Sequence, residues 1–294
     1  MSSSFKSVLR EGSLADRVIL VTGGGTGIGR CIAHEVAALG AVTLLAGRRA
    51  EPLEQVAREI ADAGGQADFV SLNIRDADSV EQAVSSLVDT HGRIDGLVNN
   101  AGGQFPAPVE DISPNGWRSV IDLNLTGTFL VSRAVYRSSM QAHGGSIVSV
   151  VANMWNGMPF MAHTGAARAG VVNLTQTMAL EWASHAVRVN AVAPGVILSS
   201  GMDTYTPEQR EGIAQQARGI PAGRIGTESE VSGATAFLLT DAASFITGET
   251  LKIDGAASLL PQPMMPMAAF EPMPIFDGFH LAQEIPEFWN PATV

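Results

Sequence analysis

The chain is poor in cysteine, lysine and tyrosine, three residue types that serve redox and proton-transfer chemistry. Its 294 residues include one cysteine, Cys31, so no disulfide can form within the chain. A lone thiol fits a reducing compartment, and we expect a cytoplasmic protein. Lysine and tyrosine are also scarce, with only Lys6, Lys252, Tyr136 and Tyr205 present. Any catalytic use of a phenol or an ammonium group must therefore draw on these positions.

Long apolar runs and basic clusters are absent as well. No stretch of 18 or more apolar residues occurs, so we expect no membrane-spanning helix. Residues Met1–Arg10 lack the apolar core of a signal peptide. The net charge is −11 and no basic run offsets it, which disfavours binding to a nucleic-acid phosphate backbone. We therefore expect a small-molecule substrate, and neither a nucleic-acid partner, a membrane partner nor a resident metal.

Short apolar runs alternate with amphipathic stretches along most of the chain. Helical patterns such as Pro52–Asp62 and Asp78–Thr90 separate the apolar runs. Near-continuous apolar strands between helices are typical of a parallel sheet covered on both faces. The sequence therefore predicts an α/β fold, a Rossmann-type, doubly wound parallel sheet with helices on both faces. Its seven strands are expected at Val18–Val21, Val42–Ala46, Ala67–Leu72, Ile94–Val98, Ile147–Val151, Val187–Ala193 and Thr250–Ile253.

The composition changes near Leu260. Residues 261–294 contain seven prolines and four methionines, together with Phe270, Phe276, Phe279, Phe288 and Trp289. A disordered tail is one interpretation of such a composition. The aromatic residues favour an arm that packs on its own subunit or on a neighbour. We therefore expect a single catalytic domain over residues 1–260, followed by a C-terminal arm over 261–294.

A glycine-rich turn follows the first expected strand and leads directly into a helical pattern. Within Thr22–Gly29, glycines stand at positions 23, 27 and 29. Glycine allows a tight turn and a close approach of the backbone to a pyrophosphate, while the next helix offers free N–H groups. A tight turn without a ligand is the alternative. The pattern favours dinucleotide binding, with contacts expected from Gly23, Thr26, Gly27, Ile28 and Gly29.

The end of the second expected strand indicates which dinucleotide binds. An acidic residue there would hydrogen-bond the ribose 2′-hydroxyl of NAD, but the sequence is Ala46-Gly47-Arg48-Arg49. An arginine at this point can pair with a 2′-phosphate. We therefore expect a preference for NADP(H) through Arg48 and Arg49, with NAD(H) also possible. The alternative is that both arginines are solvated residues at a helix start.

Three segments together resemble the short-chain dehydrogenase/reductase family: Thr22–Gly29, Asn99–Gly102 and Pro194–Ile197. The resemblance covers roughly residues 14–257. It implies that the cofactor is lined by Asn100, Ala101, Gly102 and Arg168, and by Asn73 in place of the family's adenine-contacting acid. It also implies that Pro194, Gly195 and Ile197 lie against the nicotinamide, with Ser199 where the family often has threonine.

The proton-transfer residues of that family are largely replaced. The resemblance assigns catalytic positions to Asn124, Thr164 and Arg168, where the family has asparagine, tyrosine and lysine. The family's serine position falls near Val151 or Ala152. A threonine hydroxyl ionises far less readily than a phenol, whereas an arginine still supplies positive charge. The sequence thus predicts hydride transfer without ready proton delivery to a carbonyl oxygen.

Three functions remain open. His163–Val171 is similar to peroxisomal trans-2-enoyl-CoA reductases, which use NADPH, and reduction of an enoyl thioester needs oxyanion donors more than a phenol. Met154–Pro159 and Ser200–Tyr205 resemble bacterial citronellol/citronellal dehydrogenases, which oxidise acyclic terpenoid alcohols. The third possibility is an NADP(H)-binding protein without turnover. We favour the enoyl thioester reductase.

Other residues are weaker candidates. His163 could be an acid, although capping of a helix is the more common role for such a histidine. Tyr205 could approach the site from the substrate loop, and Met154 and Trp155 could shape an apolar pocket. Family members are commonly tetramers with two long helices at a main interface, so we expect a homotetramer built on Trp117–Gln141 and Met161–His185.

Overall fold

The computed structural model describes residues 4–200, 206, 211–213, 215, 219–259 and 272–282. Its centre is a parallel sheet of seven strands in the order β3-β2-β1-β4-β5-β6-β9, which confirms the predicted Rossmann-type fold. The strands are β1 Val18–Thr22, β2 Val42–Gly47, β3 Gln66–Ser71, β4 Gly96–Asn99, β5 Gly145–Val150, β6 Val187–Pro194 and β9 Thr250–Ile253. The order reverses between β1 and β4, where such sheets open a crevice at their carboxyl edge.

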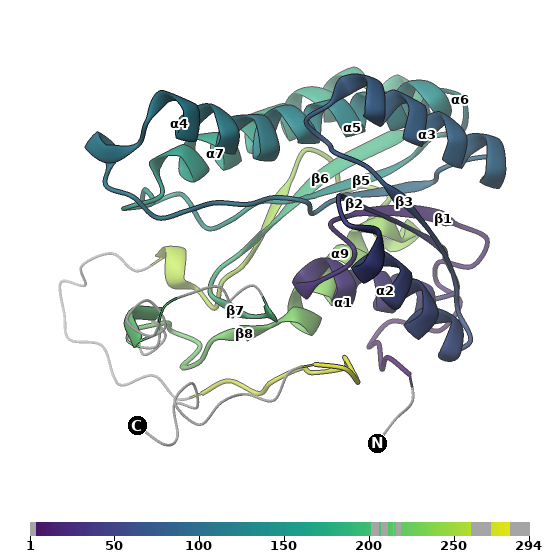
Figure 1. The fold of residues 1–294 in the computed structure, drawn as a ribbon. Helices are drawn as coiled ribbons and strands as arrows, with labels where there is room; N and C mark the ends of the chain where they lie inside the picture. The colour runs from purple at the N-terminus through teal and green to yellow at the C-terminus, as the bar shows by residue number, and fades with distance from the viewer. Residues whose placement is uncertain are drawn as a thin grey trace.

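Helices cover both faces of the sheet (Figure 1). One face carries α1 Gly27–Ala38, α2 Ala50–Asp62 and α9 Glu228–Leu239, and the other carries α3 Ala77–His91, α5 Gly127–Val135 and α7 Ala162–Glu181. Each layer has its own apolar core, because the strands bury side chains on both faces. Short 3₁₀ helices occur among the described residues at Val109–Asp111, Ala183–His185, Asp241–Ala243 and Ala257–Leu259.

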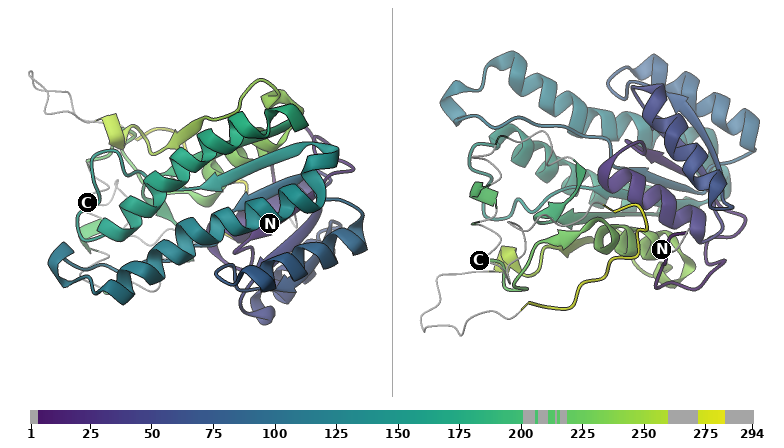
Figure 2. Two further views of the ribbon diagram at one scale, coloured as in Figure 1. Left: turned by 90° about the horizontal axis from the view of Figure 1, so that it is seen from above. Right: turned by 60° about the horizontal axis from the view of Figure 1, so that its bottom comes forward.

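The first expected long helix is longer than predicted and contains two irregular turns. It runs through α4 Pro114–Ile121, a π-helical turn at Asp122–Thr126, α5, a second π turn at Tyr136–Met140 and α6 Gln141–His143. Ser113 caps its start by accepting a hydrogen bond from the N–H of Gly116. The helix lies beside α7, as the view from above shows (Figure 2). The π turn matters for the site because it carries Asn124.

The strand boundaries differ from the sequence prediction by one or two residues. Ile94 was expected in a strand, but β4 begins at Gly96 because the N–H of Ile94 donates to Ser139 Oγ instead of joining a ladder. A small second sheet was not predicted. It pairs β7 Ile197–Leu198 with β8 Gly226–Thr227, and it holds together the two ends of the segment between β6 and α9.

Residues 272–282 run beneath α9 and α1 towards the N-terminal segment (Figure 2). The N–H of Lys6 donates to the carbonyl of Gly278, and the Phe279 ring is buried between Phe5 and Cys31. The remainder of the expected C-terminal arm, residues 261–271 and 283–294, lies outside the described residues. Within the part of the chain that is described, no helix has the length and apolar character needed to cross a membrane.

Candidate active site

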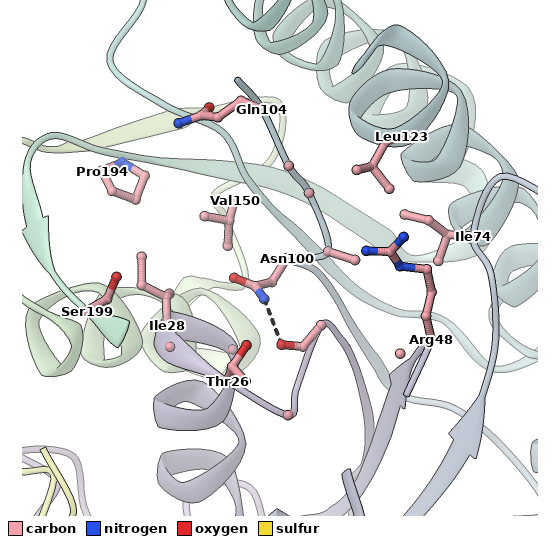
Figure 3. A pocket seen from close by; sticks show the side chains of 18 of the residues that line it. Thr26, Ile28, Arg48, Ile74, Asn100, Gln104, Leu123, Val150, Pro194 and Ser199 are labelled. Atoms are coloured by element: carbon pink, nitrogen blue, oxygen red, sulfur yellow. Dashed lines mark hydrogen bonds between the residues drawn. The ribbon is translucent and has the colours of Figure 1, made fainter. Parts of the chain in front are cut away.

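A cleft of about 660 Å³ opens at the carboxyl edge of the sheet (Figure 3). Every residue predicted to bind the cofactor lies along it: Gly23, Thr26, Gly27, Ile28, Gly29, Arg48, Arg49, Asn73, Asn100, Ala101, Gly102, Arg168, Pro194, Gly195 and Ile197. Arg48 and Ile74 lie at one end of this cleft, Gln104 and Pro194 lie towards the other, and Val150 lies between them. The cleft can therefore contact different parts of one ligand at its two ends.

The glycine turn between β1 and α1 has a conformation that larger residues would not fit. Gly23 and Gly27 have φ angles of +66° and +55°, in the left-handed region that favours glycine. A Cβ on Gly29 would lie 2.2 Å from the carbonyl oxygen of Gly23, so no side chain can be accommodated there. Thr26 caps α1 without using its side chain, which leaves the first N–H groups of the helix available to an anion.

Hydrogen bonds fix this turn to the end of β4. Thr22 Oγ1 accepts from the N–H groups of Asn100 at 3.0 Å and Ala101 at 3.1 Å. The side-chain amide of Asn100 donates to the carbonyls of Thr22 at 3.1 Å and Gly23 at 3.2 Å. The glycine turn and the strand beside it therefore form one rigid wall of the cleft.

The carboxyl end of β2 presents positive charge without an acid. Arg48 and Arg49 are exposed, line the cleft, and form no ion pair with any described residue. Ser71 Oγ donates to the carbonyl of Arg48 at 3.1 Å and holds the backbone in place. Asn73 lies beside them on the same wall. This end of the cleft can therefore hold an anionic group such as a phosphate.

Arg168 supplies a fixed positive charge beside Val150 and Gly102 in the cleft. Its Nη1 donates to the carbonyl of Val150 at 2.8 Å, and its Nη2 lies so close to Gly102 that a Cβ there would be 2.5 Å away. Burial lowers the pKa of Arg168 from its ordinary value to about 10, so the guanidinium is still charged at neutral pH. Its Nε has no hydrogen-bond partner among the described residues.

Asn124 is buried behind the cleft rather than along it. Its amide nitrogen donates to the carbonyls of Gly103 at 2.8 Å and Val120 at 2.9 Å, and its oxygen accepts from the N–H of Gly103 at 3.2 Å. The π turn places the side chain where it can make these bonds. Asn124 thus fixes the Gly102–Gln104 loop, which lines the cleft.

Thr164 is also fully buried and is not among the residues that line the cleft. Its N–H donates to His163 Nδ1 at 2.8 Å, and its Oγ1 lies 3.3 Å from the same nitrogen. Burial lowers the pKa of His163, whose ring packs edge-on against Phe105 at 4.5 Å. The structure therefore brings Arg168 to the cleft and leaves Thr164 behind its wall.

Tyr136 does not supply a phenol to the cleft. Tyr136 stacks on Trp182 at 4.1 Å, and its hydroxyl lies 3.0 Å from His185 Nδ1. Tyr205 lies outside the described residues. Lys252 is placed over the Trp155 ring at 4.3 Å, away from the cleft lining.

Several residues that line the cleft were not predicted from the sequence. They share a position within a few residues of a strand end or a helix start, which is the signal that could have found them. These residues are Gly25, Gly47, Pro52, Leu53, Leu72, Ile74, Gly103, Gln104, Leu123, Val150 and Val196. Among all the described residues that line the cleft, Arg48, Arg49 and Arg168 are the ones with ionisable side chains.

Comparison with known proteins identifies the family. A family model described as Enoyl-(Acyl carrier protein) reductase matches residues 23–257. A Bacillus subtilis (strain 168) protein named probable 2,4-dienoyl-CoA reductase is 37% identical over 250 residues, which are 84% of this chain and 98% of that protein. The chain belongs to the short-chain dehydrogenase/reductase family.

Solved structures of other short-chain dehydrogenase/reductase proteins agree with this assignment. The citronellol catabolism dehydrogenase (AtuB) of Pseudomonas aeruginosa PAO1 is 47% identical, with a TM-score of 0.78 and coverage of 86% of this chain and 100% of that chain. A Beutenbergia cavernae protein described as an NAD(P)-dependent gluconate 5-dehydrogenase, solved with bound NADP, is 38% identical with a TM-score of 0.79, covering 85% of this chain and 100% of that chain. This short-chain dehydrogenase/reductase is thus an NAD(P)-dependent oxidoreductase.

Proposed function

We propose that this enzyme uses NADPH to reduce the conjugated double bond of an unsaturated acyl thioester, an enoyl or dienoyl thioester. The observation that carries the proposal is the charge of the cleft: three arginines are the ionisable groups among its described lining residues. An arginine side chain supplies positive charge and is not a ready proton relay. Such a site suits a reaction that needs stabilisation of negative charge more than proton delivery to oxygen.

The cleft fits a dinucleotide. Free N–H groups at the start of α1, the absence of side chains at Gly23 and Gly29, and the rigid Asn100 wall suit a pyrophosphate. Arg48 and Arg49 would pair with the 2′-phosphate that distinguishes NADP(H) from NAD(H). When bound, the nicotinamide supplies the hydride.

The protein's own part is electrostatic. Addition of hydride to the β-carbon of an enoyl thioester moves negative charge to the thioester oxygen. Arg168, held by the Val150 carbonyl, and the side-chain amide of Gln104, which also lines the cleft, would donate hydrogen bonds to that oxygen. The proton that completes the reduction can then reach the α-carbon from water. No phenol is required for these steps, and the 37% identical relative named as a dienoyl-CoA reductase supports them.

A second candidate function is oxidation of an apolar alcohol. The 47% identity to the citronellol catabolism dehydrogenase favours it. The alcohol proton would then need an acceptor, and the described structure offers Thr164 Oγ1 beside His163 Nδ1 at 3.3 Å. Both side chains are fully buried, so substrate would have to displace part of the wall that covers them. We rank this function second for that reason.

One assay separates these functions. We expect the purified protein to oxidise NADPH with trans-2-enoyl-CoA or 2,4-dienoyl-CoA, followed by nicotinamide absorbance, and Arg168→Met to lower kcat by about a hundredfold. Turnover only with NADP⁺ and citronellol would support the second function instead. NADPH binding without turnover of any of these compounds would support a binding protein, the third possibility. Absence of binding to both dinucleotides would exclude all three.

A further inference from the structure

Residues 272–282 lie beyond the family-matched region, which ends at residue 257. The Bacillus relative and the citronellol catabolism dehydrogenase are covered over 98% and 100% of their lengths by 84% and 86% of this chain, so part of this chain has no counterpart in them. The segment of residues 272–282 is nevertheless docked by backbone hydrogen bonds to two separate parts of the chain. Met273 N–H donates to Ala222 at 2.9 Å, and Gly278 accepts from Lys6 at 2.9 Å.

The far end of the segment is anchored on α1. The Phe279 ring is 5% exposed and lies 5.1 Å from the His34 ring, with the Arg30 guanidinium 5.4 Å above it. Gly278 lies so close to the N-terminal segment that a Cβ would be 2.1 Å from the Lys6 oxygen. The segment therefore has a defined position on α1, the helix that begins at the glycine turn.

The middle of the segment is anchored on the first turn of α9. Ser229 Oγ accepts from the N–H groups of Gly278 and Phe279, both at 3.1 Å. Thr227 Oγ1 donates to the Phe276 carbonyl at 2.7 Å. Thr227 is also the N-cap of α9 and the last residue of β8, so these bonds join the segment to the small sheet.

Arg224 connects the near end of the segment to the same place. Its guanidinium donates to the carbonyls of Met273 at 2.8 Å and Pro274 at 2.6 Å, and to both carboxylate oxygens of Glu230. Glu230 in turn accepts from the N–H of Thr227 at 2.9 Å. The Arg224 side chain is 10% exposed and its bonds to Glu230 are partly buried, whereas its bonds to the Met273 and Pro274 carbonyls lie at the surface.

The small sheet carries this constraint to the cleft. Gly226 in β8 pairs with Ile197 in β7, and its N–H donates to the Val196 carbonyl at 2.9 Å. The contact is tight, since a Cβ on Gly226 would lie 2.6 Å from Ile197 Cδ1. Val196 and Ile197 line the cleft next to Pro194. A shift of β8 would therefore move this wall.

We propose that residues 272–282 act as a clamp, and that Arg224 is a positioning residue through which the clamp holds β8 and thereby sets the Val196–Ser199 wall of the cleft. This role rests on the proposed function only in that the cleft binds a nicotinamide dinucleotide and a thioester. The clamp contributes affinity and not chemistry, because none of its described residues lines the cleft.

The test uses point variants of the full chain. Arg224→Gln removes most of the hydrogen bonds from the guanidinium to Glu230, Met273 and Pro274. Gly278→Ala adds a methyl group that pushes the segment away from Lys6, and it does not alter any residue that lines the cleft. We expect each to raise the Kd of NADPH, measured by nicotinamide fluorescence, and the KM of the thioester by about tenfold, with kcat within about twofold. Arg224→Lys, which can still pair with Glu230, should recover part of the affinity. Ile275→Ala is the matched control, because that side chain of the segment is 52% exposed.

The outcomes separate the clamp from the proposed function. If full-length protein binds NADPH and the variants lose thermal stability with unchanged Kd and KM, the segment only stabilises the fold and the clamp is wrong. If Ile275→Ala weakens binding as much as Gly278→Ala, the effect is not specific and the clamp is equally wrong. Failure of the wild-type protein to bind either dinucleotide would instead sink the proposed function. Should Arg224→Gln fold poorly, Gly278→Ala decides the matter.

Discussion

At the scale of single residues, the charge of the cleft comes from arginines that differ in their exposure to water. Arg48 is exposed and free of ion pairs with described residues, so it is available to a ligand phosphate. We predict that Arg48→Asp raises the KM of NADPH by at least about tenfold, because it places a negative charge beside the 2′-phosphate, and that it leaves the KM of NADH nearly unchanged. Steady-state kinetics with both cofactors measures this, and equal effects on the two would contradict the assignment.

Arg168 predicts an unusual pH profile. Its pKa, lowered by burial to about 10, keeps the guanidinium charged throughout the neutral range. At saturating NADPH and thioester, we expect kcat to be constant from about pH 6 to pH 9 and to fall as the pH approaches 10, where the charge that stabilises the thioester oxygen is lost. A break in kcat near neutral pH would point instead to a histidine, and His163 would be the residue to substitute.

Glu228 is a titrating group in the wall behind the glycine turn. Burial raises its pKa to about 7, an effect that Arg30 partly offsets. The unfolded chain releases this proton near pH 4.5, so stability is lost as the pH rises from about 4.5 to 7. Each pKa unit corresponds to about 1.4 kcal/mol.

Glu228→Gln should remove this loss of folding stability at higher pH, because glutamine carries no ionisable proton. We expect the variant to gain stability relative to the wild type, by up to about 3 kcal/mol, as the pH is raised from 5 to 7.5. Denaturant unfolding at both pH values measures the difference. A difference between the two proteins that does not change with pH would show that Glu228 ionises normally in the folded state.

The site residues that could be predicted from the sequence are those whose roles depend on the conformation of the neighbouring backbone. Gly29 and Arg48 belong to a turn and a strand end that the sequence marks directly. Thr164 was predicted from its place in a family motif, and the structure buries it beside His163. Arg224 and Glu228 could not be found from sequence, since their roles arise from contacts with segments far away in the chain.

At the scale of elements, strands were predictable and helix irregularities were not. Buried parallel strands are short and apolar on both faces, so each apolar run marks one strand within about two residues. The π turn at Asp122–Thr126 lies within a longer helix, where the sequence predicted only an uninterrupted helix. The docking of residues 272–282 likewise has no periodic signal, because that segment forms neither helix nor strand.

The turn between β1 and α1 can be tested by adding a single methyl group. Gly29→Ala places a Cβ 2.2 Å from the Gly23 oxygen and 2.4 Å from Asn100 Nδ2, so the turn must shift. We expect the Kd of NADPH to rise by at least about tenfold, as the N–H groups lose their alignment. Gly233→Ala is the control, since its methyl group would make only ordinary contacts at 3.7 Å or more. Equal affinity in both variants would argue against pyrophosphate binding at this turn.

At the scale of the whole molecule, exposed apolar side chains suggest how copies associate. Leu180 on α7 is 82% exposed, and Phe129 on α5 and Trp117 on α4 are each 40% exposed. These helices lie side by side on one face of the sheet (Figure 2). Burial of such side chains in a symmetric interface would remove apolar area from water, which is a main driving force of association. We therefore propose these helices as one interface of the homotetramer that the family resemblance implies.

Native mass spectrometry of the full chain tests this expectation. Leu180→Asp would place a charge at the centre of an apolar contact between copies, so we predict that it converts tetramers to dimers or monomers at micromolar concentration. Val8→Asp is the matched control, because Val8 is 71% exposed and belongs to the N-terminal segment, outside these three helices. A wild-type monomer, or tetramers that persist in Leu180→Asp, would show that α7 is a solvent-facing helix, and the exposure of its leucine would then need no partner.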